Sequence, residues 1–251
     1  MAIDDEVRAV AWKSGAVALV VAAVQYVVAE AMAASAWRDP VYDYAHNFIS
    51  DLGVPSCGGV LQGRTICSPL NAVMNAGFIA QGLLFVAAAL VLQHLLPGWL
   101  RWAYLVLAVV HGVGIVLVGL VHGSPEADRD GSMAWHGLGA GMAIIGGNLL
   151  AVVVGGHLVR SGRARWPGWA VLGCGAVGLV CAVVLLTMMP TDPVPYHAAV
   201  FERGSVYSIT AAELIAGATV LRALRGLRGL RGLHGLHGPG SGAPQPVGTA
   251  D

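Results

Sequence analysis

Long apolar stretches alternate with short polar segments along most of this chain. A membrane-spanning helix needs about 20 mostly apolar residues, because the hydrocarbon core of a bilayer is about 30 Å thick and each helical residue rises about 1.5 Å. Breakers such as Pro97-Gly98, Pro125 and Pro167-Gly168 stand between the stretches. The pattern therefore predicts an all-α membrane protein, a bundle of six transmembrane helices over residues 12–35, 71–95, 100–121, 134–157, 167–189 and 205–223.

The composition agrees with this membrane assignment. Of 251 residues, 56% are hydrophobic and only 11% are charged, against about 25% charged residues in a soluble globular domain. Such a chain has too few charges to cover a water-exposed surface, so membrane lipid is the expected partner. The formal net charge is zero, and no nucleic acid partner is expected.

The basic residues predict the orientation of the bundle. If both termini are in the cytoplasm, ten of the 14 Arg and Lys residues lie on the cytoplasmic side and four lie on the outer side. The positive-inside rule therefore predicts cytoplasmic termini. The acidic start, with Asp4, Asp5 and Glu6, is the wrong flank for a cleaved signal peptide, so the first helix is expected to stay. We expect a multi-pass protein of a bacterial plasma membrane.

The C-terminal part has a different character. From Arg222 the triplet Arg-Gly-Leu recurs, and each Gly in a helix costs about 1 kcal/mol. We therefore divide the chain into a transmembrane domain, residues 1–223, and a mobile basic tail, residues 224–251, of which 238–251 are expected to be disordered.

Two cysteines share the first outer loop. Cys57 and Cys67 lie in an oxidising compartment in this topology, which favours a disulfide. Two exposed thiols or two metal ligands are the alternatives.

Polar residues from separate loops gather at the outer boundary of the predicted bundle. They include four of the nine histidines. This polar cluster consists of His46, Asn47, Ser50, Asp51, His122, His136, His197, Glu202 and Arg203.

Three interpretations of this cluster stay open. His46, Asp51, His136 and His197 are possible ligands of a zinc ion with an open position for water. Ser50 with a loop histidine would allow acyl transfer, with Ser50, Asp51, His136 and His197 as catalytic candidates. A structural network of hydrogen bonds is the third interpretation. No spacing in the chain is a recognised metal motif.

Glu30, His111 and Glu213 fall inside the predicted spans, away from the span ends. Ionisable groups at that depth are expensive unless they are paired or neutral, and they are candidates for function. His111 is the natural partner for Glu213. Together the three would form the polar path of a small-solute or proton-coupled transporter, although no internal repeat supports that function.

The segment His46-Asn-Phe-Ile-Ser-Asp-Leu-Gly53, followed by Asn75-Ala-Gly-Phe-Ile-Ala-Gln-Gly82, resembles the DUF998 family of membrane proteins. Gly119-Leu-Val-His-Gly, His136 and Phe201-Glu-Arg-Gly204 also fit that family. The resemblance covers nearly all of the chain except the tail. It implies that a shared core is formed by Ser50, Asp51, Gly53, Asn75, His136, Glu202 and Arg203.

One departure concerns His122. Members of the family often carry Phe-Pro where this chain has Val121-His122, so His122 is peculiar to this protein. The Ile-Ser-Asp-Leu-Gly element also resembles the Frag1/DRAM/Sfk1 membrane proteins, which are tied to lipid handling. We therefore expect a protein that binds lipid or another hydrophobic ligand, with the polar cluster at its outer face. A zinc-dependent lipid hydrolase and a transporter are the alternatives; whether it is an enzyme, and its oligomeric state, stay open.

Overall fold

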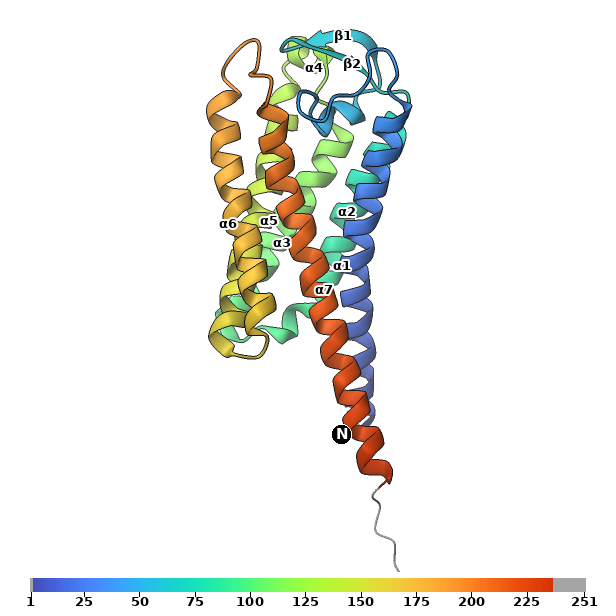
Figure 1. The fold of residues 1–251 in the computed structure, drawn as a ribbon, viewed down its shortest axis with the longest axis vertical. Coiled ribbons are helices and arrows are strands. Elements are labelled where there is room, and N and C mark those ends of the chain that lie inside the picture. Colours follow the sequence, from blue (N-terminus) through green and yellow to red (C-terminus); the bar gives the residue numbers. More distant parts are fainter. Residues whose placement is uncertain (1, 237–251) are drawn as a thin grey trace, which may run out of the picture.

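The computed structural model describes residues 2–236, with the side chains of residue 4 and of residues 6–226. Six of its helices are long and apolar enough to cross a membrane, as predicted. They form an elongated bundle (Figure 1). The long helices are α1 (Ala2–Ala36), α2 (Asn71–Leu92), α3 (Gly98–Leu120), α5 (Met133–Ser161), α6 (Arg165–Met188) and α7 (Ala198–Leu236); the short helix η2 (Gln93–Leu95) extends α2.

The helices form a closed ring in chain order. Each long helix packs against the next one in the sequence, and α7 returns to pack against α1. Close contact between α3 and α5 depends on glycine, because a Cβ at Gly114 would lie 2.5 Å from the backbone nitrogen of Ala143. Gly139 on α5 faces the backbone of Gly114 in turn. Small residues allow two helices to approach this closely.

The last helix differs most from the prediction. It begins at Ala198 rather than near residue 205, because the charged pair Glu202-Arg203 is accommodated by buried partners. It continues through the triplet repeat to Leu236, where a mobile tail was expected from residue 224. Arg and Leu are good helix formers that offset the glycines, and α1 runs beside α7 at this end (Figure 1). The expected disorder of residues 238–251 lies outside the described residues.

One end of the bundle is covered by folded loops, and we call it the capped end; the opposite end, where the chain starts, is the termini end. The cap contains η1 (Ser50–Gly53), the strands β1 (Cys57–Leu61) and β2 (Arg64–Cys67), and α4 (Pro125–Asp130). The two strands form an antiparallel hairpin with Cys57 opposite Cys67 and Leu61 opposite Arg64. In Figure 1 this hairpin crosses the top of the bundle.

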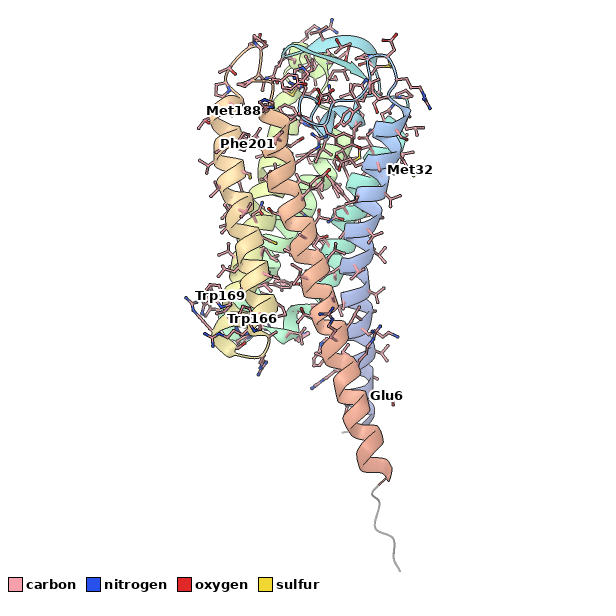
Figure 2. The ribbon with its side chains drawn as sticks, in the orientation of Figure 1. Glu6, Met32, Trp166, Trp169, Met188 and Phe201 are labelled. Atoms are coloured by element: carbon pink, nitrogen blue, oxygen red, sulfur yellow. A yellow bond between two sulfur atoms is a disulfide. The ribbon has the colours of Figure 1, made fainter. Side chains whose placement is uncertain are left out.

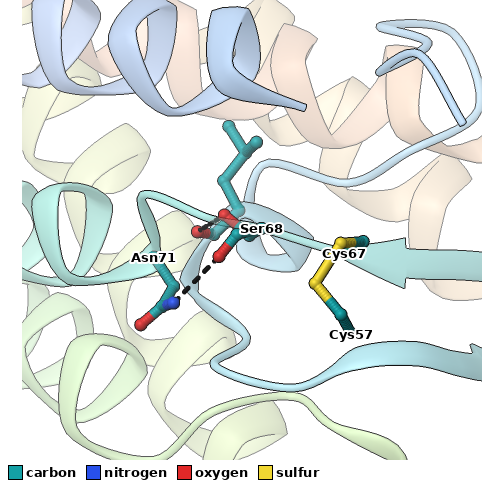
Figure 3. The surroundings of a disulfide bond; sticks show 5 residues. Cys57, Cys67, Ser68 and Asn71 are labelled. Atoms are coloured by element: carbon teal, nitrogen blue, oxygen red, sulfur yellow. Dashed lines mark hydrogen bonds between the residues drawn. A yellow bond between two sulfur atoms is a disulfide. The ribbon is translucent and has the colours of Figure 1, made fainter. Parts of the chain in front are cut away.

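The hairpin is fastened to the rest of the cap. A disulfide joins Cys57 and Cys67. Next to it, the Ser68 hydroxyl donates a hydrogen bond of 2.6 Å to the carbonyl of Leu52, and the Asn71 amide donates one of 2.8 Å to the carbonyl of Ser68 (Figure 3). The hairpin therefore connects η1 to the start of α2.

Exposed tryptophans lie near both ends of the bundle, with Trp135 near the cap. Trp166 and Trp169 lie at the start of α6 (Figure 2), and Trp99 and Trp102 lie at the start of α3. Tryptophan is enriched where a membrane meets water. Between this level and the cap, α6 exposes valines such as Val177, Val180 and Val183, a surface suited to lipid.

Candidate functional site

A buried ion pair lies at the centre of the cap. Nε of Arg64 donates to Oδ2 of Asp51 at 2.9 Å, and Nη2 donates to Oδ1 at 3.2 Å. The backbone N–H of Phe48 donates to the same carboxylate at 2.9 Å, and the Phe48 ring lies 4.2 Å from the Arg64 guanidinium carbon. Asp51 and Arg64 are both almost fully buried. The two-pronged geometry and the added N–H satisfy charges that burial would otherwise make costly.

A second buried network joins the first and last spans. Nε of Arg203 on α7 lies 3.4 Å from Oε1 of Glu30 on α1. The hydroxyl of Tyr207 donates to both Glu30 oxygens at 2.8 and 2.9 Å. On its other side, Arg203 donates to the carbonyls of Tyr44 and Asn47 at 2.7 Å each. One guanidinium thus holds α1, α7 and the first cap loop together.

The neighbouring Glu202 has a different partner. Its carboxylate accepts a hydrogen bond of 2.5 Å from the backbone N–H of Ile49, while Arg203 also donates to the hydroxyl of Tyr42. Burial raises the pKa of Tyr42 well above its usual value, so its hydroxyl stays protonated and donates to the carbonyl of Phe48 at 2.8 Å. Adjacent residues on a helix point in different directions, which explains the separate partners.

The histidines of the polar cluster have separate surroundings. Nδ1 of His136 lies 2.7 Å from the carbonyl of Val121, to which it donates. His46 stacks on the ring of Tyr196 at 4.8 Å, and His197 meets the same ring edge-on at 5.0 Å. Burial lowers the pKa of His122.

Tyr196 also anchors the cap loops to one another. Its hydroxyl donates to the Asp43 carboxylate, a bond that lowers the pKa of Asp43, and the Ala45 backbone N–H donates to the same carboxylate. The loop before α7 is thereby tied to the loop after α1.

The structure does not bring the expected metal ligands to one point. No group of three or more His, Cys, Asp or Glu side chains that could hold a metal occurs in the described part of the chain. Asp51 is engaged by Arg64, His136 by a backbone carbonyl, and His46 by a tyrosine ring. Ser50, the expected nucleophile, has no hydrogen bond to a histidine in the same described range.

In the middle of the bundle, Glu213 has an unexpected partner. Nε2 of Gln81 on α2 donates a hydrogen bond of 2.7 Å to Oε1 of Glu213. The expected partner, His111, instead has its Nδ1 2.7 Å from the carbonyl of Ala143 and its ring 4.5 Å from that of Phe85. Sequence reasoning missed Gln81, because an amide inside an apolar span carries no charge to draw attention to it.

An apolar cavity of about 260 Å³ extends from Glu213 toward the termini end. Ile209 and Ala223, which are 14 residues apart on α7, both line it, so it follows about 21 Å of helix axis. His157 and Arg163 lie at its far end. In Figure 1, α6 and α7 lie closer together near the cap than toward the termini end. Val171 on α6 and Ala216 on α7 both line the cavity. Its apolar walls include Leu19, Phe85, Leu92, Leu96, Leu150, Val154, Ala216 and Val220.

The family model DUF998, described as a protein of unknown function, matches residues 20–219. The match covers all or most of each span, the cap and the cavity-lining part of α7 up to Thr219. No curated protein and no solved structure matches the chain.

Proposed function

The chain belongs to the DUF998 family of proteins of unknown function, and from that premise we propose that it binds the hydrocarbon chain of a membrane amphiphile in the apolar cavity. The observation that carries this proposal is the shape and lining of the cavity. It is elongated, it is walled mainly by Leu, Val, Ala and Phe, and its volume of about 260 Å³ is close to the lower end of ligand pockets, about 300 Å³.

The surroundings of the cavity support a ligand that comes from the membrane. The cavity lies among helices long and apolar enough to span the bilayer, and Val171 on α6 and Ala216 on α7 both line it. Arg163 and His157 stand at its end near the membrane surface, where a basic side chain attracts anionic lipid by about 1 kcal/mol. An amphiphile in the adjoining leaflet therefore meets an apolar groove with a polar rim.

We infer that this leaflet is the cytoplasmic one and that the cap faces the outside of a bacterial plasma membrane. The excess of Arg and Lys at the termini end supports this orientation. The Cys57–Cys67 disulfide in the cap supports it as well, because disulfides persist in oxidising compartments.

In this proposal the polar cluster at the cap has a structural role. Its charged members bind one another or the loop backbone, as Asp51 binds Arg64 and Glu202 binds the Ile49 N–H. The ligand site lies in the opposite half of the bundle, not at the outer mouth where the sequence suggested it. A zinc-dependent hydrolase gains no support from the geometry, because no group of three or more described His, Cys, Asp or Glu side chains could hold a metal.

Photo-crosslinking tests the proposal directly. The protein is placed in phosphatidylcholine nanodiscs with a long-chain fatty alcohol that carries a diazirine in its chain, and labelled peptides are mapped by mass spectrometry. We expect labels on the cavity walls, around Leu150 and Val220. The Ala216→Trp substitution fills the cavity and should reduce these labels to background.

The matched control is Leu214→Trp on the same helix. Leu214 is 37% exposed and does not line the cavity, so this variant should retain the labels on Leu150 and Val220. Equal labelling of both tryptophan variants, or labels confined to lipid-facing valines such as Val180, would refute chain binding in the cavity.

A further inference from the structure

Three buried polar atoms near the deep end of the cavity are unpaired. Oε2 of Glu213, Oε1 of Gln81 and Nε2 of His111 have no hydrogen-bond partner, although each side chain is at least 97% buried. They come from three helices, α7, α2 and α3. Buried polar atoms are nearly always paired, so three unpaired atoms at one level require an explanation.

These atoms lie where two cavities meet. Glu213 lines the large apolar cavity. Gln81 and His111 line a smaller one of about 20 Å³, and Ile209 lines both. The backbone of Gly147, another wall residue of the large cavity, is so close to His111 that a Cβ there would lie 2.7 Å from Nδ1. A polar group that enters along the large cavity therefore reaches Glu213 and its hydrogen bond with Gln81, with the His111 ring next to the wall residue Gly147.

The existing hydrogen bonds define what such a group must offer. Gln81 uses its amide nitrogen on Glu213, which leaves its carbonyl oxygen, an acceptor. A backbone carbonyl only accepts, so Nδ1 of His111 carries the proton that bonds Ala143, and Nε2 of the neutral ring is an acceptor too. The third atom, Oε2 of Glu213, accepts when the carboxyl group is ionised and carries the proton when it is neutral. The deep end is thus rich in acceptors and poor in donors.

We propose, resting on chain binding in the cavity, that the bound amphiphile carries a hydrogen-bond-donating end group, a hydroxyl or an amine, and that this end lies against Glu213, Gln81 and His111. Its hydrocarbon chain extends along the cavity toward the termini end. A carboxylate or phosphate end group would bring further acceptors next to the free acceptors of Gln81 and His111 and is disfavoured there, because a buried acceptor without a donor is costly. A plain alkane would leave the three atoms unpaired.

Competition among ligands of equal chain length tests this end-group preference. Hexadecanol, hexadecylamine, hexadecanoate and hexadecane each compete with the diazirine alcohol for labelling in phosphatidylcholine nanodiscs. We expect the alcohol or the amine to compete at about tenfold lower concentration than the alkane and the carboxylate, which corresponds to a net gain of one good hydrogen bond. The alcohol and amine arms identify which donor the site prefers.

The Glu213→Leu variant keeps the approximate volume and removes the carboxyl group. It should still be labelled on the cavity walls but should lose the preference, so that alcohol and alkane compete equally. If Glu213→Leu does not fold, Glu213→Gln serves in its place, since its amide turns one acceptor into a donor and should weaken the amine and the alcohol. The order in which the four ligands compete for the wild-type protein tests the end-group preference even without either variant.

The outcomes separate this inference from the proposed function. If wild-type protein is labelled in the cavity but alkane or carboxylate competes as well as alcohol and amine, chain binding stands and the end-group assignment is wrong. If no ligand is held in the cavity, both are wrong.

Discussion

Arg203 on the last span and Glu30 on the first form a buried ion pair, with 3.4 Å between Nε and Oε1. The two residues are far apart in the sequence, and their contact closes the ring of helices at the capped end. A buried ion pair is weak evidence for added stability, but removal of one partner leaves a charge without compensation. The pair therefore constrains which residues the two positions tolerate.

Glu30→Gln and Arg203→Met should each lower the free energy of unfolding by about 3–5 kcal/mol. The double variant should lose less than the sum, because neither charge is then left alone. Unfolding by sodium dodecyl sulfate in mixed micelles measures the free energy of unfolding of the two single variants and the double variant. Glu126→Gln is the control: Glu126 pairs with Arg129 at 3.1 Å on the exposed surface, where an ion pair contributes little to stability. Additive losses in the double variant would contradict a direct coupling.

Gly53→Ala should destabilise the cap by about 1–3 kcal/mol. A Cβ at Gly53 would lie 2.4 Å from Oδ1 of Asn75, whose Nδ2 donates 2.8 Å to the carbonyl of Gly53. In the same unfolding assay, Gly53→Ala should lower the free energy of unfolding by less when Asn75 is also replaced by alanine. Gly137→Ala, on a helix face with nothing within 4 Å of the added Cβ, should cause no loss. Similar effects at Gly53 and Gly137 would argue against the close contact.

Replacement of Cys57 and Cys67 by serine should lower stability by about 2–3 kcal/mol, because the bridge restricts a short loop in the unfolded chain. Alkylation followed by mass spectrometry should find Cys174 and Cys181, the free cysteines, modified before reduction and all four modified after it. The Cys174→Ser and Cys181→Ser variants should keep the stability of the native cap. Modification of all four thiols before reduction would show that the bridge does not form in the membrane.

The orientation is checked in intact cells with a membrane-impermeant maleimide. A cysteine placed at Val41, which is 75% exposed in the cap, should react. A cysteine at Trp166, exposed at the termini end, should react only after the cells are opened. The reverse pattern would place the cap in the cytoplasm and the cavity in the other leaflet.

The six spans could be predicted because their length and composition are local properties of the chain. Buried contacts are different: Gln81 meets Glu213, and Arg64 meets Asp51, only after the helices and the cap have packed. Arg64 even entered the positive-inside count as an ordinary loop charge. The cavity could not be predicted for another reason. Ala216 lines the cavity and Leu214 is exposed on the outside of the bundle, but both residues are apolar, so the sequence does not distinguish them.

Helix α7 carries polar contacts at successive depths: Arg203 with the cap loop, Tyr207 with Glu30, and Glu213 with Gln81 at the edge of the cavity. A helix rotates or slides as one stiff rod, so none of these contacts can shift without moving the others. A shift of α7 by one residue, about 1.5 Å along its axis with a turn of about 100°, would therefore break all three contacts at once.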